Sequence, residues 1–220
     1  MSRSERLSRK VRKLALRGAI EVHGATSRCW RMGFAYRSAR SPVKPDAAQL
    51  DTIRRQAEAA LANNIMPFWA SHAVDDQHGG FVTHLDRAGQ WLGPTDKYLV
   101  PQARLVWTFA AAHRHGFVGK GYLDMAAAGA RFLVERMWDA KAGGFHWAVQ
   151  RDGRPLIGDK DTYGQAFAIF ALSEYALAGD SQWARNWAIN TFDVLIERAG
   201  DGTFGFREKF DEYWLPTPGR

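Results

Sequence analysis

Five segments of the chain carry apolar residues at the three- and four-residue spacing of a helix that buries one side. In the first of them, Ile53, Ala57, Leu61 and Ile65 follow one another at this spacing. The pattern predicts helices over residues 50–69, 101–115, 122–138, 162–178 and 181–198. Asp180 or Ser181 can cap the last one, because both side chains accept a hydrogen bond from the first helical turn.

The five predicted helices alternate in character. The first, third and fifth are amphipathic with charged faces, whereas the second and fourth are apolar and aromatic around most of their circumference. A helix that is apolar all round is typically buried. The alternation therefore predicts pairs of one exposed and one buried helix.

An internal repeat separates the helices. Gly79-Gly80-Phe81 recurs as Gly143-Gly144-Phe145, and a weaker copy, Phe204-Gly205-Phe206, follows after a similar interval. Alternating residues after the first Phe predict a strand over residues 81–85, and Arg-x-Gly sequences at 87–89 and 151–153 predict turns. Each copy is predicted to be a small β-hairpin. A period of roughly 60 residues predicts helical hairpins that stack and close into a double-walled toroid.

The second and fourth helices also match each other. Gln102-Ala103 aligns with Gln165-Ala166 at nearly the same offset as the hairpins, and Arg104 stands where the fourth helix has Phe167. An unpaired charge buried in protein is strongly destabilising. Arg104 is therefore expected to face either a partner or a polar cavity.

Composition excludes several classes of protein. With 220 residues, 46% hydrophobic and 24% charged, the chain has the make-up of an ordinary globular protein. No apolar stretch approaches the ~20 residues that cross a membrane, so no membrane partner is expected. Cys29 is the only cysteine, which excludes an internal disulfide framework and a cysteine-based zinc site.

The net charge of +7 is concentrated at the N-terminus. Residues 1–45 hold 12 Lys and Arg against Glu5 and Glu21, a net of +10, which leaves −3 for residues 46–220. We expect residues 1–45 to form a basic, disordered arm that ends in a proline-containing linker. A transit peptide, a tail for nucleic acid or an anionic surface, and sequence outside the natural reading frame are alternatives. No motif supports nucleic-acid binding, and a cytoplasmic location is expected unless the arm is an organelle address.

Four motifs together resemble the N-acylglucosamine 2-epimerase family, which includes cellobiose 2-epimerases and mannose isomerases. They are Pro67-Phe68-Trp69, the Gly-Gly-Phe hairpin, residues 102–109 (QARLVWTF) and residues 163–175 (YGQAFAIFALSEY). The resemblance extends over about residues 48–214. It implies an all-α fold, an α/α toroid of the six-hairpin type with short β-hairpins between helices. Residues 46–220 would then be the incomplete N-terminal half of that toroid.

The resemblance also implies a reaction. Members of the family move a proton at C2 of a sugar through an enediolate, or interconvert aldose and ketose, without a metal or redox cofactor. Arg104 corresponds to the arginine near the reacting oxygens and Tyr163 to an aromatic residue that lines the sugar pocket. Enediolate chemistry needs a base and a fixed cation for the developing oxyanion. Trp107 and Phe167 are further candidates for substrate binding, with plain packing as the alternative for both.

The family's catalytic histidines are expected beyond this chain. None of the seven histidines of this chain falls at a position where the family has its catalytic base. We therefore expect a sugar 2-epimerase or isomerase for mannose- or glucose-type sugars, free, N-acylated or disaccharide, that is inactive as this chain alone. The alternative is a non-catalytic half-toroid that binds a carbohydrate or a partner chain, with self-association through its open inner helices. A glycoside hydrolase would need two carboxylates, for which Glu174 and Asp161 are candidates without a supporting motif.

Overall fold

The computed structural model describes residues 44–117 and 121–218. The chain divides between Pro45 and Asp46 into two units, and the helices and strands below belong to the second. The predicted disordered arm over residues 1–45 lies outside the described residues, apart from Lys44 and Pro45.

Each of the five predicted helices is present, with ends within a few residues of the expected ones. They are α2 (Ala47–Ala60), which continues through a π-helical turn (Leu61–Ile65) into α3 (Met66–His72), α4 (Leu99–Arg114), α5 (Tyr122–Phe132) with a π-helical turn (Leu133–Met137), α6 (Thr162–Gly179) and α7 (Gln182–Ala199). No helix among the described residues is long and apolar enough to cross a membrane.

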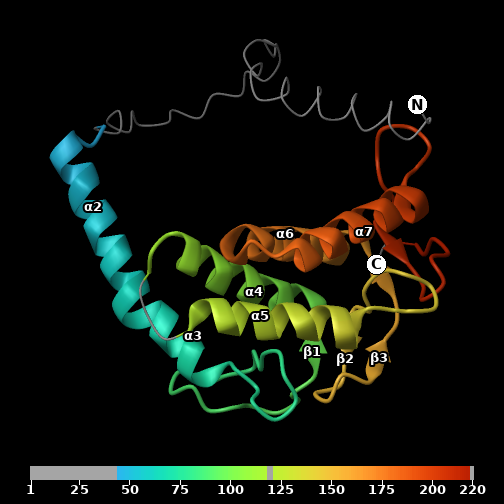
Figure 1. The fold of residues 1–220 in the computed structure, drawn as a ribbon, viewed down its shortest axis with the longest axis horizontal. Helices are drawn as coiled ribbons and strands as arrows, with labels where there is room; N and C mark the ends of the chain where they lie inside the picture. Colours follow the sequence, from blue (N-terminus) through green and yellow to red (C-terminus); the bar gives the residue numbers. More distant parts are fainter. Residues whose placement is uncertain (1–43, 118–120, 219–220) are drawn as a thin grey trace, which may run out of the picture. The chain divides into compact units, whose positions relative to one another are not determined.

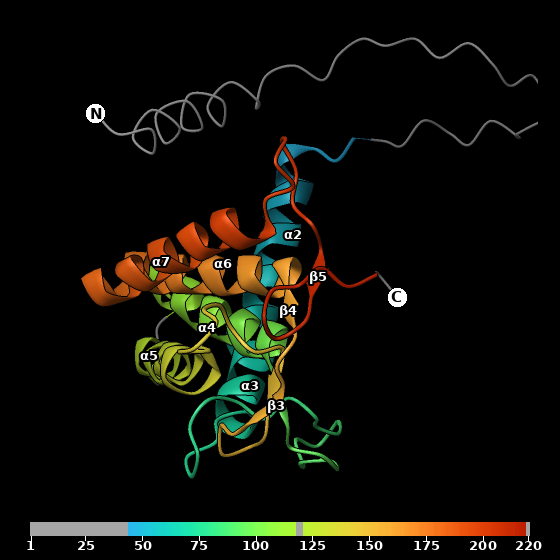
Figure 2. The same cartoon turned by 90° about the vertical axis from the view of Figure 1, so that its right-hand side faces the viewer.

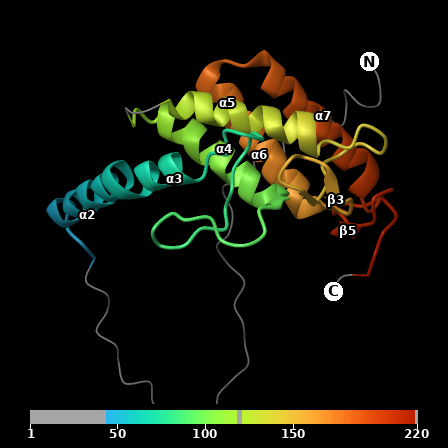
Figure 3. The ribbon, with the colours of Figure 1, turned by 90° about the horizontal axis from the view of Figure 1, so that it is seen from below.

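The helices form two layers. α4 and α6 pack side by side, α5 packs on α4, and α7 packs on α6. Figures 2 and 3 show α5 and α7 on the same side of the α4–α6 pair. α4 and α6 are therefore the inner pair and α5 and α7 the outer pair of the predicted double wall.

The inner helix α6 is only partly buried, contrary to the expectation from its apolar sequence. Ala168, Ala171 and Leu172 lie in the core, but Phe170 and Leu177 are exposed. Neighbouring helices cover α6 on the sides that face α4 and α7, and no described element covers the remaining side. A helix whose sequence is apolar on all sides is thus an inner helix in this protein, but other helices do not cover every side of it.

The first helix begins with a capping box. The Asp46 side chain accepts from the Gln49 N–H at 2.8 Å, and the Gln49 side chain accepts from the Asp46 N–H at 3.0 Å. No residue of α2 is buried. The π-helical turn ends two residues before Pro67, which has no N–H to give to the helical ladder.

Short strands connect the helices at one end. β1 (Lys97–Tyr98), β2 (Ala148–Val149) and β3 (Pro155–Ile157) form an antiparallel sheet in this order, and β4 (Lys160–Asp161) pairs with β5 (Lys209–Phe210). We call residues 74–91, 138–157 and 200–216 the first, second and third hairpin.

The second hairpin turns at the predicted Arg-x-Gly sequence between β2 and β3, but the strand predicted over residues 81–85 is absent. Phe81 and Leu85 form only single bridges, to Val74 and Trp91. The reason is that a side chain satisfies the backbone of Phe81: Gln102 of α4 accepts from its N–H at 2.8 Å and donates to its carbonyl at 2.6 Å. A strand partner is therefore not needed there.

Candidate active site on the inner helix pair

The four site residues predicted from the sequence meet on the inner helices. The Arg104 guanidinium of α4 lies 4.9 Å from the centre of the Phe167 ring of α6. The Tyr163 ring meets the Phe167 ring edge to face at 4.8 Å. Trp107, one turn after Arg104, stacks on Phe170 at 5.2 Å. We call these five side chains the inner wall.

The two helices place these side chains in register because they run in parallel. Arg104 contacts Phe167 and Trp107 contacts Phe170, and the same sequence interval separates the partners in both pairs. Gln102 precedes Arg104 by two residues, a rotation of about 200° around the helix. Since Gln102 points to the buried Phe81, Arg104 points the opposite way, toward the side that α5 does not cover.

Arg104 is exposed, and no described carboxylate forms an ion pair with it. Its contact with the Phe167 ring is a cation–π interaction, which holds the guanidinium plane without neutralising its charge. The alternative of a structural arginine paired with a carboxylate therefore has no support within the described ranges.

Tyr163 is held by its backbone rather than by its ring. The N-cap Asp161 accepts from the Tyr163 N–H at 2.9 Å, and Lys209 of β5 contacts the same carboxylate at 3.2 Å. The Tyr163 side chain is 51% exposed. About half of Tyr163 is thus accessible to solvent, beside Phe167.

Phe170 is a member of the wall that sequence reasoning missed. A signal existed, because Phe170 follows Phe167 by one helical turn, just as Trp107 follows Arg104. The stacked pair also buries the Trp107 Nε1 atom, which has no hydrogen-bond partner among the described residues. The wall therefore offers donors and aromatic faces, with Arg104 as its positive charge.

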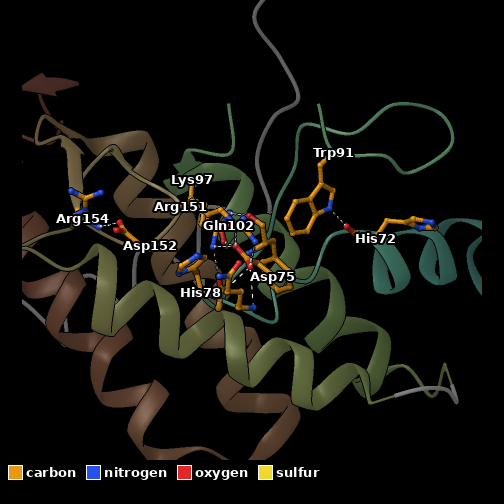
Figure 4. A network of polar contacts seen from close by, with 12 residues as sticks. His72, Asp75, His78, Trp91, Lys97, Gln102, Arg151, Asp152 and Arg154 are labelled. Atoms are coloured by element: carbon orange, nitrogen blue, oxygen red, sulfur yellow. Dashed lines mark hydrogen bonds and ion pairs between the residues drawn. The ribbon is translucent and has the colours of Figure 1, made fainter. Parts of the chain in front are cut away.

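A buried polar network holds the beginning of α4 behind the wall (Figure 4). Asp75 of the first hairpin contacts Lys97 Nζ at 2.9 Å and binds Arg151 of the second hairpin through two hydrogen bonds, at 2.8 and 2.9 Å. Arg151 also lies over the ring of Trp91 at 4.7 Å, and Trp91 donates to the His72 carbonyl at 2.9 Å.

The network keeps its carboxylate ionised. Burial by itself would raise the pKa of Asp75, but the hydrogen bonds from Arg151 and Lys97 outweigh burial and hold that pKa well below its ordinary value. Asp75 is therefore charged throughout the neutral range, and it ties two hairpins to the first residue of β1.

The second hairpin and α6 repeat this arrangement. Lys160 contacts Asp139 at 2.9 Å, and Gln165 accepts from the Phe145 N–H at 2.8 Å and donates to its carbonyl at 2.9 Å. Sequence reasoning aligned Gln102 with Gln165 but assigned them no role. The repeated arrangement could have been predicted from the sequence, because both copies have an Asp four residues before the Gly-Gly pair and a Lys before the Gln.

No described histidine takes part in the contacts that form the inner wall. His113 and His115 end α4, and nine helical residues separate His113 from Arg104, about 13 Å along the axis. His72 ends α3, and its Nδ1–H donates to the Phe68 carbonyl at 2.8 Å. His146, in the second hairpin, is half-buried, and burial lowers its pKa, aided by Lys160.

The two carboxylates considered for a glycoside hydrolase lie at opposite ends of α6. Thirteen residues separate Asp161 from Glu174, about 20 Å along a helix, whereas a hydrolytic pair stands about 5 to 10 Å apart. Glu174 is instead bound by Arg114 at 2.6 Å and Asp161 by Lys209. The geometry of these residues does not suit glycoside hydrolysis.

The inner helices run in parallel, with an outer layer on one side and a polar–aromatic face on the other. This arrangement defines a segment of an α/α toroid. Its inner wall is suited to a polar ligand with an apolar face. The sequence profile of the N-acylglucosamine 2-epimerase (GlcNAc 2-epimerase) family matches residues 79–220. The chain belongs to this family.

Relatives with solved structures share the fold. A cellobiose 2-epimerase from Spirochaeta thermophila is 37% identical, with a TM-score of 0.73, over 79% of this chain and 43% of that one. A D-mannose isomerase is 25% identical, with a TM-score of 0.67, over 74% and 42%. The cellobiose 2-epimerase of Bacteroides fragilis is 29% identical over 74% of this chain and 42% of its own length. The chain spans about two fifths of the length of these relatives.

Proposed function

We propose that this chain is part of a sugar 2-epimerase or aldose–ketose isomerase acting at C2 of a mannose- or glucose-type sugar, free, N-acylated or within a disaccharide. The observation that carries the proposal is the Arg104 guanidinium, without a carboxylate partner in the described ranges, fixed over Phe167 beside the half-exposed Tyr163. The relatives named cellobiose 2-epimerase and D-mannose isomerase support the same class of reaction.

Arg104 supplies a fixed positive charge to the oxygens of the open-chain sugar. When the C2 proton leaves, negative charge develops on the neighbouring oxygen, and a cation already in place stabilises that charge without reorganising. The Phe167 ring helps because it orients the guanidinium and leaves its N–H groups free for the ligand.

Tyr163, Phe167 and the stacked Trp107–Phe170 pair bind and orient the sugar. An aromatic face packs against the C–H groups of a pyranose or open-chain sugar, while the Tyr163 hydroxyl donates a hydrogen bond to one of its hydroxyls.

The proton itself needs a base, and no described histidine takes part in the contacts of the inner wall. We therefore infer that this chain binds sugar but does not exchange the C2 proton at an enzymatic rate by itself. The second candidate, a non-catalytic half-toroid that binds a sugar or a partner chain, is favoured by the exposed apolar residues of α6 and α7.

A sugar titration tests the binding proposal. Isotope-labelled protein is titrated with mannose, N-acetylmannosamine and cellobiose while the indole N–H signal of Trp107 is followed by NMR. We expect a saturable shift with at least one sugar and a roughly tenfold loss of affinity in Arg104→Ala, the size expected for one hydrogen bond to a charged group. Arg154→Ala, a surface arginine paired with Asp152, is the matched control and should bind as the unchanged chain does.

Two outcomes would contradict the proposal in different ways. Absence of any Trp107 shift with all three sugars would exclude the inner wall as a sugar site. Rapid exchange of the sugar C2 proton in heavy water would show that this chain carries a base of its own.

A further inference from the structure

The third hairpin shares one backbone hydrogen bond and one bridge with the first two. Asp201 N–H donates to the Gly205 carbonyl at 3.1 Å, as Asp75 does to Gly80 at 3.1 Å and Asp139 to Gly144 at 2.8 Å. A single antiparallel bridge follows in each copy: Val74 with Phe81, Trp138 with Phe145, and Gly200 with Phe206. Residues 200–206 are therefore a third, shortened copy of this unit. Four positions instead of five separate the aspartate from the glycine before the phenylalanine, and Gly205, unlike Gly80 and Gly144, has no positive φ.

In the first two copies, the next inner helix closes the hairpin. Gln102 and Gln165 each bind both backbone groups of the hairpin phenylalanine, and Lys97 and Lys160 each pair with the hairpin aspartate. The helix that follows also covers the ring, so that Phe81 and Phe145 are at most 1% exposed.

In the third copy, none of these contacts is made by a described residue. Phe206 is 46% exposed and Phe204 is fully exposed. The Asp201 carboxylate turns back to the Thr203 hydroxyl at 2.7 Å instead of meeting a lysine. The third copy thus keeps the backbone hydrogen bond and the bridge of the first two, while its binding side is open.

The two closed copies define what binds such a hairpin. In both, the lysine stands five residues before the glutamine, and the helix begins two residues after the lysine, at Leu99 and at Thr162. The lysine itself follows the aspartate by 22 positions in the first copy and by 21 in the second. The spacing is tight because one rigid helix start must reach both the carboxylate and the phenylalanine backbone.

We propose that the third hairpin is a docking site for a helix of the α4 and α6 kind, one that begins just after a lysine and carries, five residues after that lysine, a glutamine. The lysine neutralises Asp201, the glutamine side chain binds the Phe206 N–H and carbonyl, and the apolar flank of the helix covers the two exposed phenylalanine rings. The proposal rests on the repeat and not on the proposed reaction.

The test supplies such a helix in cis. A copy of residues 160–179 is appended after Arg220 through one linking residue, so that its lysine follows Asp201 at the same interval as Lys160 follows Asp139. Tethering keeps the helix at a high effective concentration beside the hairpin. Hydrogen exchange of the Phe206 amide is then measured by NMR, with the Phe81 and Phe145 amides as internal references for closed hairpins.

We expect the Phe206 amide to exchange at least tenfold more slowly in the extended protein than in the unchanged chain. The matched control carries Gln165→Ala in the appended copy only. It should lose most of this protection, because it cannot form the two hydrogen bonds to Phe206. The apolar flank of the helix is unchanged in this control.

An equally fast Phe206 exchange with and without the extension overturns the proposal, whether or not the appended segment is helical. Equal protection by the Gln165→Ala extension overturns the assigned recognition. Protection that grows with concentration in the unchanged chain identifies a second copy as the occupant and likewise overturns it. Sugar titration of the unchanged chain is independent of all three results.

Discussion

At the residue scale, a few buried polar side chains take the role that backbone pairing has in other proteins. Gln102 and Gln165 replace a strand partner for Phe81 and Phe145, and Asp75 joins two hairpins through Lys97 and Arg151. Such groups stabilise only as complete sets, because removal of one partner leaves another polar group buried and unpaired.

Asp75 should make the stability of the chain depend on pH in acid. Its pKa is lower in the folded state than in the unfolded chain, so the unfolded state binds more protons as the pH falls. The contribution is therefore complete above about pH 4, the ordinary range of an aspartate, and is lost progressively below it. Urea unfolding between pH 7 and pH 2.5 measures this slope.

Asp75→Asn should flatten that slope and lower stability at pH 7 by about 3–5 kcal/mol, because Lys97 remains buried without its carboxylate. The double variant Asp75→Asn with Lys97→Met removes both charges and should recover part of the loss. Asp193→Asn, at an exposed position of α7, is the control. An unchanged slope in Asp75→Asn would contradict the assigned role of the network.

At the element scale, the layers approach each other closely where glycine permits it. A Cβ atom on Gly129 of α5 would lie 2.5 Å from the Phe81 ring and 2.7 Å from Val106 of α4. α5 can therefore pack against the first hairpin and α4 only because this position has no side chain, although glycine is a poor helix former.

Gly129→Ala should lower the free energy of unfolding by about 1–3 kcal/mol, the usual cost of an overpacked core. This cost should exceed the gain of at most about 1 kcal/mol from the better helix propensity of alanine. Gly179→Ala in α6 is the matched control, since its nearest neighbour would be 3.4 Å away. A Gly129→Ala variant as stable as the Gly179→Ala variant in thermal unfolding would show that the helices can separate freely.

At the scale of the whole molecule, the described helices leave large apolar residues exposed. Ile189, Phe192 and Ile196 of α7 are exposed at helical spacing, and Phe170 and Leu177 are exposed on α6. The chain spans about two fifths of the length of these relatives. Surfaces of this kind favour association.

We predict that the chain self-associates through these residues. The mass measured by light scattering should rise with concentration, and Phe192→Glu with Ile196→Glu should shift it toward that of the monomer. Leu156→Glu, an equally exposed apolar position on β3, should leave it unchanged. A single monomeric mass at every concentration would argue against an associating half-toroid.

The sequence alone was sufficient for the helices, the positions of the hairpins, the inner and outer alternation and the family. Periodicity and the repeated Gly-Gly-Phe are local signals, because they follow from the helical repeat and from backbone conformations that glycine adopts. The resemblance also assigned Arg104 and Tyr163, and it left Trp107 and Phe167 between substrate binding and packing. The four lie together as a wall because α4 and α6 run in parallel and in register.

The tertiary structure alone decided how these parts are held. It showed that Gln102 replaces the strand predicted over residues 81–85, that Asp75 joins residues 22 and 76 positions away, and that α6 is buried on only part of its circumference. Such features depend on contacts between residues distant in the sequence, and no local pattern specifies which side chain will reach a given backbone group. The first two hairpins make these contacts with the helix that follows, whereas no described residue makes them with the third. This difference is the basis for the docking site proposed at the third hairpin.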